Sequence, residues 1–234
     1  MKRFVFGLVV AALMLFGPGL RADDSSKANA AGTVITVSGK VTLYSDSSDG
    51  APLTIGKAVF AGDRIKTGSN GRAMLVLSDG TQLKLNYLTD ITLRDKDIQG
   101  KASPRGIALI KIALGDLWAR VTKKDSKLEF ETPSAVAAVK GTNPVLTVLP
   151  DGNTCVSLIE GSMMMNSGGC SQGIKGNQQI CIAPGQKACD ATVTPLSNPG
   201  TWFTEINSAS TAVVTLNVKD AAGNMHNIQV QYSK

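Results

Sequence analysis

The sequence predicts an all-β protein, a multi-hairpin β-sandwich or stacked β-roll with a C-terminal β-hairpin appendage. Short stretches that alternate apolar and polar residues recur along the chain, and this is the period of a half-buried strand. The dipeptide Asp-Gly stands between two pairs of such stretches, at 79–80 and 151–152, and it favours the positive-φ turn of a hairpin. Aromatic residues make up only 5% of the chain, so we expect a core of Val, Leu, Ile, Ala and Met.

The first 22 residues have the pattern of a secretory signal peptide. Lys2 and Arg3 precede an apolar run at 4–16, which Gly17-Pro18-Gly19 ends shortly before Ala22. The run has about 13 residues, whereas roughly 20 are needed to cross a bilayer. A retained membrane anchor is therefore the weaker alternative.

Residues 23–31 lack an apolar period and are rich in small and charged residues, which predicts a disordered leader. Cleavage after Ala22 fits the small residue there, and cleavage after Ala30 is the alternative. No cysteine stands directly after the apolar run, where the signal peptide would be cleaved, so we expect no N-terminal lipid. These features predict a periplasmic or secreted protein without stable membrane insertion after cleavage of the signal peptide.

Charge gives no argument for nucleic acid. Removing Lys2, Arg3 and Arg21 with the signal peptide lowers the formal net charge from +6 to +3, because all acidic residues follow Ala22. A small net positive charge over a chain of this length does not indicate a basic surface that could bind nucleic acid. The basic cluster at 123–127 is interrupted by Asp125, which favours a solvated turn. No glycine-rich phosphate-binding motif is present, so direct nucleotide binding has no support.

The first strands are predicted between residues 33 and 44. β-branched residues are dense on both sides of Ser38-Gly39, which favours two strands or one bent strand. The loop Ser45–Gly50 then reverses the chain. Its aspartates suggest calcium, but the loop lacks the later Glu of an EF-hand, so we interpret it as an ordinary oxygen-rich turn. The hairpin block Gly62–Leu85 follows, with Asp79-Gly80 as its turn.

Residues 107–121 allow two interpretations. Apolar residues at helical spacing would fit a helix, whereas alternation on both sides of Gly115-Asp116 fits a strand, a turn and a second strand. We prefer the strands. The segment 135–139 is also ambiguous, because Ala-Val-Ala-Ala-Val favours a helix when it is taken alone.

Two segments resemble the FecR-type domain of bacterial envelope proteins. The first, Gly62–Leu85, carries G-D-x-I-x-T-G, then N-G-R-A, then the Asp-Gly hairpin. The second, Phe130–Thr142, is similar to the element F-x-T-P-x-A-x-x-x-R/K-G-T. The motif residues are Gly62, Asp63, Thr67, Gly68, Gly71, Arg72, Asp79, Gly80, Thr132, Pro133, Gly141 and Thr142.

The resemblance spans residues 33–190 and implies a FecR-type β domain, which we place at 32–194, followed by a linker and hairpin at 195–234. It also implies strands on both sides of Gly115-Asp116 and an extended run at 135–139. The sequence departs from the family pattern at Asn143-Pro144. Proline removes one hydrogen-bond donor of the ladder there, which leaves the start of that strand open.

The rest of the chain continues the β pattern. The stretch 147–158 repeats the hairpin at 75–85, which suggests stacked, related units. Residues 168–177 are glycine-rich and predict a loop, and 179–183 resembles the closing strand of the family. After the linker 195–200, Thr211–Tyr232 predicts one hairpin, and two strands need a larger body to pack on. We expect that contact to involve Trp202 and Phe203.

Cys155, Cys170, Cys181 and Cys189 lie close together in a chain with an export signal, which favours two disulfides over free thiols. Their spacing contains no zinc knuckle. The sequence allows three connectivities. We favour Cys155 with Cys189 and Cys170 with Cys181, because the second pair would close the glycine-rich loop and the first would join its outer strands.

No residue pattern indicates catalysis or a cofactor. The one histidine, His226, starts the last predicted strand far from any nucleophile pattern. The run Met163-Met164-Met165 could bind a soft metal, but filling of the core explains it without a ligand. We therefore expect no enzyme activity, no cofactor and no metal.

The resemblance implies a non-enzymatic module that binds an envelope protein for signalling or scaffolding. The best-known family members join such a domain to a transmembrane helix and a cytoplasmic segment that controls a sigma factor. The sequence has neither part, so we expect a binding role in the envelope rather than direct sigma-factor control. The alternative is a structural or cell-wall carbohydrate-associated surface protein. We expect the partner at an exposed sheet edge, which the C-terminal hairpin either occupies or extends.

Overall fold

The computed structural model describes residues 30–45, 49–95, 109–123, 128–206, 212–219 and 225–232, the last two ranges as backbone only. The predicted signal peptide and most of the leader lie outside these residues. The leader was expected to extend through Ala31, but Ala31 is buried and its N–H donates to Val59 O at 2.8 Å. Ala31 is therefore part of the folded domain, one residue earlier than the predicted start at 32.

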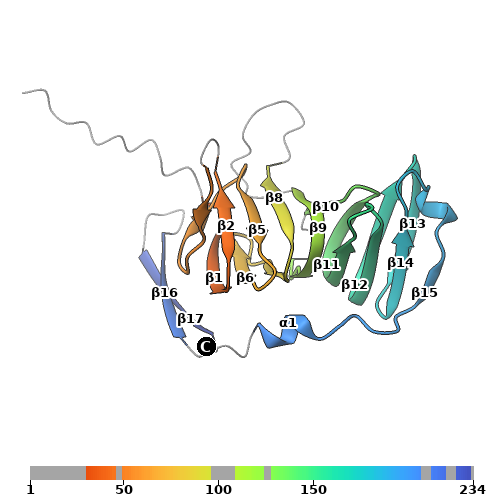
Figure 1. The fold of residues 1–234 in the computed structure, drawn as a ribbon. Coiled ribbons are helices and arrows are strands. Elements are labelled where there is room, and N and C mark those ends of the chain that lie inside the picture. The colour runs from red at the N-terminus through yellow and green to blue at the C-terminus, as the bar shows by residue number, and fades with distance from the viewer. Residues whose placement is uncertain are drawn as a thin grey trace, which may run out of the picture.

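The described residues form seventeen strands, a 3-10 turn and one short helix (Figure 1). They are β1 Gly32–Ser38, β2 Val41–Tyr44, β3 Ala51–Pro52, β4 Ala58–Val59, β5 Arg64–Thr67, β6 Arg72–Leu77, β7 Gln82–Leu85, β8 Asp90–Arg94, β9 Leu109–Arg120, β10 Glu129–Glu131, β11 Val136–Val148, β12 Thr154–Ser167, β13 Cys170–Lys175, β14 Gln178–Ile182, η2 Ala188–Asp190, β15 Val193–Pro195, α1 Trp202–Glu205, β16 Ala212–Lys219 and β17 Met225–Tyr232. The all-β prediction is confirmed.

Strands β1 to β15 form one continuous network, which bent strands divide into two layers. Sheet A contains, in order, β4, β1, β6, β7, residues 115–120 of β9, 143–148 of β11, 154–158 of β12, β14 and β15. Sheet B contains β3, β2, β5, β8, the first half of β9, β10, the first half of β11, the second half of β12 and β13.

Glycines make the bends by which long strands pass from one sheet to the other. Gly115 in β9, Gly141 in β11 and Gly161 in β12 have φ of +92°, +58° and +93°, values that L side chains rarely adopt. A Cβ on Gly115 would lie 2.5 Å from Thr89 Cα. The predicted strand, turn and strand at 107–121 is therefore a single strand, β9, bent at Gly115.

One aliphatic core fills the space between the two sheets. Alternate residues of strands in both sheets are buried in it, for example Leu83 and Leu85 of β7 and Ile110 and Ile112 of β9. Phe130 is the one aromatic side chain among the large, fully buried residues described. This composition agrees with the prediction of a core built from Val, Leu, Ile, Ala and Met.

Both Asp-Gly hairpins are present, and their backbone hydrogen bonds match. In the β6–β7 hairpin Leu77 N donates to Thr81 O, and in the β11–β12 hairpin Leu149 N donates to Asn153 O, at 2.8 and 2.9 Å. Gly80 and Gly152 have φ of +87° and +84°. The predicted repeat is therefore a repeat of structure.

The structure differs from the sequence-based expectations at residues 168–177 and resolves the strand geometry at Asn143-Pro144. The register of β11 shifts around Asn143 and Pro144, so the proline lies at a bulge, where its missing N–H interrupts the ladder least. The prediction of a loop at 168–177 is wrong, because β13 occupies 170–175 and pairs with β12. The glycines at 168, 169 and 176 lie in the turns on either side, and β12 supplies hydrogen-bond partners that local composition does not show.

The C-terminal hairpin forms as predicted. β16 and β17 pair with each other in antiparallel register from Ala212 opposite Tyr232 to Lys219 opposite Met225. Among the described strands they make a separate two-stranded sheet, so in this structure the hairpin neither occupies nor extends an edge of the large sheet. The side chain of His226 in β17 lies outside the described residues. No described helix is long and apolar enough to cross a membrane.

Candidate functional site

The outer face of sheet A breaks the burial pattern that strand alternation predicts. Trp118 of β9 is paired with Lys84 of β7 on one side and with Val145 of β11 on the other. All three alternate with core residues and so point away from the core. Yet their exposed fractions are only 6%, 2% and 4%. Another part of the chain must cover this face.

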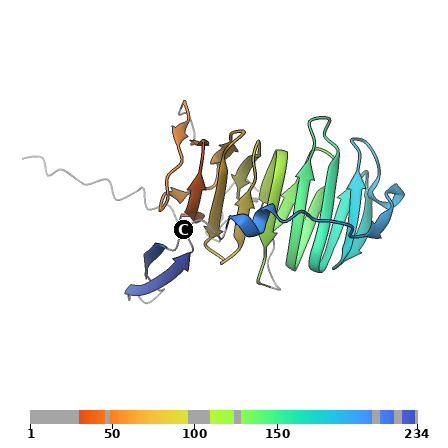
Figure 2. The same ribbon diagram turned by 60° about the horizontal axis from the view of Figure 1, so that its bottom comes forward.

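The covering segment is residues 196–206, here called the strap. Figure 2 shows it running from β15 back across sheet A and ending in α1 over β7 and β9. Phe203 of α1 stacks on Trp118, with ring centroids 5.7 Å apart and planes 10° from parallel. Trp202 packs edge-on against Phe203 at 5.8 Å. Of the two residues expected to pack on the main body, Phe203 does so directly, and Trp202 packs against Phe203.

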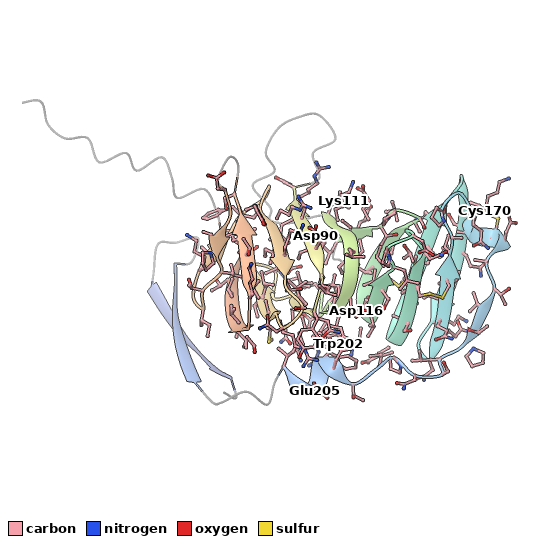
Figure 3. All side chains as sticks on the ribbon, viewed as in Figure 1. Asp90, Lys111, Asp116, Cys170, Trp202 and Glu205 are labelled. Atoms are coloured by element: carbon pink, nitrogen blue, oxygen red, sulfur yellow. A yellow bond between two sulfur atoms is a disulfide. The ribbon has the colours of Figure 1, made fainter. Side chains whose placement is uncertain are left out.

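Two cationic side chains of sheet A, from β7 and β6, bind the strap. Lys84 Nζ donates to the backbone O of Phe203 at 2.7 Å and lies 4.6 Å from the centroid of the Trp118 ring. Arg72 Nη1 donates to Glu205 Oε2 at 2.7 Å. The strap is thus recognised through an aromatic ring, a backbone carbonyl and a carboxylate. In the view of Figure 3, Trp202 and Glu205 lie beneath the sheet.

Arg72 is itself positioned by the loop after β7. Its Nε donates to Asn86 Oδ1 at 3.0 Å, and its guanidinium lies 4.2 Å from the centroid of the Tyr87 ring. Tyr87 and Leu88 are 40% and 59% exposed. Leu88 has φ of +52°, a conformation that is unusual for a bulky residue. An exposed apolar pair therefore borders the arginine.

Asp116, at the bend of β9, ties neighbouring strands together. Its Oδ1 accepts from Thr147 Oγ1 at 2.7 Å and its Oδ2 accepts from Asn86 Nδ2 at 3.1 Å. The amide of Asn86 thus joins Asp116 to Arg72. This network fixes the edge of the strap-binding face and leaves the carboxylate of Asp116 occupied in structural contacts.

Burial lowers the pKa of Lys84 to about 8, from an ordinary value of 10.5, because a desolvated ammonium loses its hydration. Trp118 Nε1 is buried and has no hydrogen-bond partner among the described residues. The site therefore contains a destabilised cation and an unsatisfied donor, both at the strap contact.

The motif residue Arg72 belongs to this site, whereas Gly62 and Asp63 have structural roles. Gly62 has φ of +99°, and its N–H donates to Leu93 O at 2.7 Å. Asp63 is buried and accepts from Ser45 Oγ and from Phe60 N. Both residues stabilise the turn before β5.

Thr67, Gly68 and Gly71 form the corner between β5 and β6. Thr67 Oγ1 donates to Asn86 O at 2.6 Å, and Gly68 N donates to Lys40 O at 2.8 Å. A Cβ on Gly71 would lie 2.0 Å from Lys40 O. The corner is thus too tight for a side chain at 71.

Asp79 and Gly80 shape the β6–β7 turn, where Asp79 accepts from Thr81 N at 2.8 Å and from Thr81 Oγ1 at 2.9 Å. In the second motif segment, Thr132 Oγ1 donates to Ala135 O and accepts from Ala135 N, and so closes the turn before β11. Pro133 lies exposed in that turn. Gly141 and the buried Thr142 lie at the bend of β11.

The four cysteines form two disulfides, as predicted, but the favoured pairing of Cys155 with Cys189 and Cys170 with Cys181 is wrong. The bonds are Cys155–Cys181 and Cys170–Cys189. Register explains the first, because Cys155 of β12 lies directly opposite Cys181 of β14 with 4.1 Å between the Cα atoms. The second joins the start of β13 to η2. Disulfides are typical of proteins outside the reducing cytoplasm.

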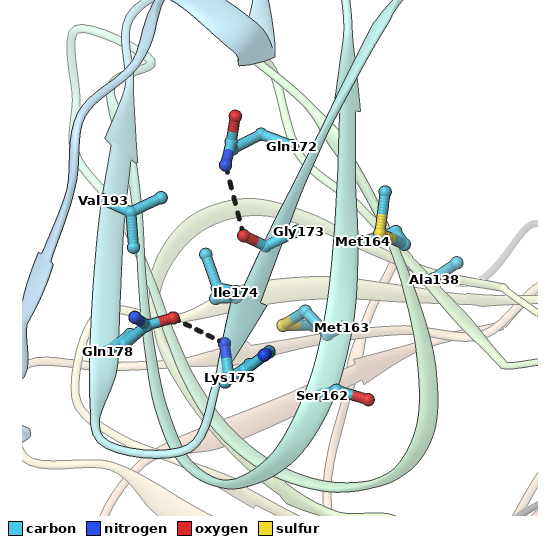
Figure 4. A pocket seen from close by; sticks show the side chains of 10 residues that line it. All are labelled: Ala138, Ser162, Met163, Met164, Gln172, Gly173, Ile174, Lys175, Gln178 and Val193. Atoms are coloured by element: carbon cyan, nitrogen blue, oxygen red, sulfur yellow. Dashed lines mark hydrogen bonds between the residues drawn. The ribbon is translucent and has the colours of Figure 1, made fainter.

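The three consecutive methionines do not converge on a metal site. They alternate along β12, so Met163 and Met165 are buried in the core whereas Met164 is exposed. Met163 and Met164 line an open cavity of about 660 Å³ between β13 and the edge of sheet A (Figure 4). Its other lining residues, among them Ser162, Gln172 and Lys175, bring no converging set of charges. Within the residues that the structure describes, no group of three or more His, Cys, Asp or Glu could hold a metal.

The outer face of sheet B carries surface ion pairs between oppositely charged side chains of neighbouring strands. Arg64 contacts Asp90 through two hydrogen bonds of 2.8 and 2.6 Å, and this bonding raises the pKa of Arg64. Lys111 Nζ lies 3.0 Å from Glu131 Oε1. In each pair the cationic side chain is about half exposed, so the pairs contribute little to stability.

Sequence reasoning identified Arg72 as a motif residue but did not single out Lys84, Asn86, Asp116, Trp118 or Glu205. A lysine and a tryptophan at outward positions of strands look like ordinary surface residues. The signal that marks them is their burial, and this depends on where the strap crosses the sheet, with Phe203 lying 119 positions after Lys84 and 85 after Trp118.

Comparison with known proteins gives a family match and two structural likenesses. Residues 63–164 match the family model described as FecR protein. A search of the curated proteins found no match. Two solved structures, both entitled "putative anti-sigma factor" from Parabacteroides distasonis ATCC 8503, have a TM-score of 0.49 with this chain. The structure solved at 1.65 Å resolution is 15% identical to this chain, and the alignment covers 68% of this chain and 70% of the other. The structure solved at 2.50 Å is 14% identical, and the alignment covers 73% of this chain and 84% of the other.

Proposed function

We propose that this chain, which carries a FecR domain at residues 63–164, is an exported, non-enzymatic module that binds an envelope protein for signalling or scaffolding. The family match is the observation that carries the proposal, because the FecR family is regulatory and acts through contacts between proteins. The two disulfides support export, since such bonds persist in oxidising compartments. We place the module at 32–194, with the linker and hairpin at 195–234.

The structure offers a surface suited to this role. On the outer face of sheet A, side chains of several strands hold a polypeptide segment, the strap, through stacking, a charge-assisted hydrogen bond and an ion pair. The exposed pair Tyr87 and Leu88 borders this surface. Exposed apolar side chains beside a polar rim are common in protein-binding surfaces.

The test is crosslinking in the bacterial envelope with the full-length protein. A photo-crosslinking amino acid replaces Leu88 in one variant and Met164, which is exposed on sheet B, in a matched control. We expect the variant at position 88 to form a discrete protein adduct that the variant at position 164 does not form. The same adduct should form again when the purified protein and the purified partner are mixed. Binding to isolated peptidoglycan without any protein adduct would instead favour a cell-wall-associated protein and contradict the proposal.

A further inference from the structure

We propose that the face formed by Trp118, Lys84 and Arg72 is a peptide-binding site that takes from its partner a segment with an aromatic residue and, two positions later, a carboxylate. The strap is then a displaceable cover that occupies the site in the absence of the partner. This inference rests on the proposed function and names the surface and the chemistry through which the partner binds.

The strap itself shows which chemistry fits the site. Phe203 supplies the ring that stacks on Trp118 and the carbonyl that Lys84 binds, and Glu205 supplies the carboxylate that Arg72 binds. A partner segment with the same order of groups would meet the same three side chains in the same geometry. A lysine and an arginine in these places disfavour a basic segment.

The contacts of the strap indicate a weak hold. α1 has only four residues, and a helix of that length has no stability of its own in water. The Glu205 side chain is 60% exposed, and exposed ion pairs stabilise little. A competing segment therefore needs only a modest affinity to displace the strap.

Two features of the site are left unused by the strap and favour a foreign occupant. Trp118 Nε1 is a buried donor with no partner among the described residues. Tyr87 and Leu88 remain exposed next to Arg72, and Leu88 keeps a strained backbone conformation. A longer segment could cover this pair and offer an acceptor to the indole. Strained, exposed residues of this kind are concentrated at binding sites.

Peptide binding tests the proposal directly. The probe is a fluorescein-labelled peptide with the sequence of residues 199–207, PGTWFTEIN, added to the full mature chain and followed by anisotropy. Replacing Phe203 and Glu205 by alanine in the protein removes the internal competitor, so this opened variant should bind the peptide about tenfold more tightly than wild type. A peptide with alanine in place of its Phe and Glu should not bind.

Site variants in the opened protein identify the surface. Arg72→Gln should weaken peptide binding about tenfold, whereas Arg72→Lys should restore part of it. Lys111→Met, on the opposite sheet, is the matched control and should have no effect. Equal binding to wild type and opened variant, or equal loss in Arg72→Gln and Lys111→Met, would overturn the proposal. Trp118 and Trp202 are the only two tryptophans, so intrinsic fluorescence reports departure of the strap independently.

The outcomes separate this inference from the proposed function. If the peptide binds as described but no envelope protein crosslinks at position 88, the site stands and the proposed envelope partner fails. If a partner crosslinks and the unlabelled peptide does not compete with it, the partner binds elsewhere, and the proposed function stands without this site.

Discussion

Lys84 combines a charged side chain with an almost fully buried position, and the strap causes this combination. Its stem lies on the sheet between Met74 and Trp118, and its ammonium reaches the carbonyl of Phe203. The desolvation that lowers its pKa to about 8 means that the folded chain disfavours the charged form. One residue therefore couples protonation to closure of the strap.

The coupling predicts how stability depends on pH. Between about pH 8 and the ordinary lysine value of 10.5, the folded chain has released a proton that the unfolded chain still binds, so stability rises with pH. Below pH 8 both states are protonated and the cost of burying the charge is fully present. From pH 7.5 to 10, the free energy of unfolding of wild type should rise by on the order of 1 to 2 kcal/mol relative to that of Lys84→Met. Chemical denaturation of both proteins at each pH measures this difference. Parallel curves for the two proteins would contradict the assignment.

At the residue scale, the sequence predicted correctly the roles of residues whose conformation depends on their neighbours in the chain. The positive φ of Gly80 and Gly152 and the side-chain bonds of Asp79 follow from turn chemistry. The site residue Trp118 depends instead on Phe203, 85 positions away, and no local period reports such a contact. This is why the motif residues proved mainly structural and only Arg72 contacts the strap.

At the scale of elements, bends within strands organise the fold. Gly115→Ala should destabilise much more than Gly80→Ala, although both glycines have positive φ. At Gly80 the nearest atom to an added Cβ is 4.0 Å away, so the cost is backbone strain of about 1 to 2 kcal/mol. At Gly115 the added Cβ would also collide with the backbone of Thr89, which brings the cost to roughly 3 kcal/mol or more. Thermal unfolding of the two variants decides the order, and equal losses would refute the role of the bend.

The disulfides give a second prediction for elements. Cys155–Cys181 joins β12 to β14, and Cys170–Cys189 joins β13 to η2, with sequence separations of 26 and 19. Loops of this size predict a stabilisation of about 3 kcal/mol for each bond. Peptide mapping without reduction should recover these two pairs, and reduction should lower the denaturation midpoint. Four alkylatable thiols in protein taken from its native compartment would disprove the pairing.

Strand existence could be predicted from the sequence better than strand partnership. Alternation and Asp-Gly turns fixed the hairpins β6–β7 and β11–β12, because these are local. The cysteine pairing was wrong because it depends on the register of β12 against β14, which no spacing rule contains. β13 was missed for a similar reason, since its hydrogen bonds come from β12 while its own composition resembles a loop.

At the scale of the whole molecule, the strap is the long-range connection that links the last strands of the sandwich back to its middle. It leaves β15 at one end and returns to β7 and β9 (Figure 2). The hairpin β16–β17 follows it and, among the described strands, pairs only with itself. Control of the site should therefore lie with the strap rather than with the hairpin.

Two truncations separate these elements. Deleting 208–234 removes the hairpin and keeps the strap, so Trp118 should stay covered and crosslinking at position 88 should resemble that of the full chain. Deleting 198–234 removes both, exposes Trp118 to solvent quenchers and should increase partner capture, because the internal competitor is lost. Far-ultraviolet circular dichroism must show the same strand signal for the core of both proteins. If loss of the hairpin alone abolished capture, the hairpin itself would be the binding element, as a strand-pairing mode of recognition requires, and the strap would be only a structural tie.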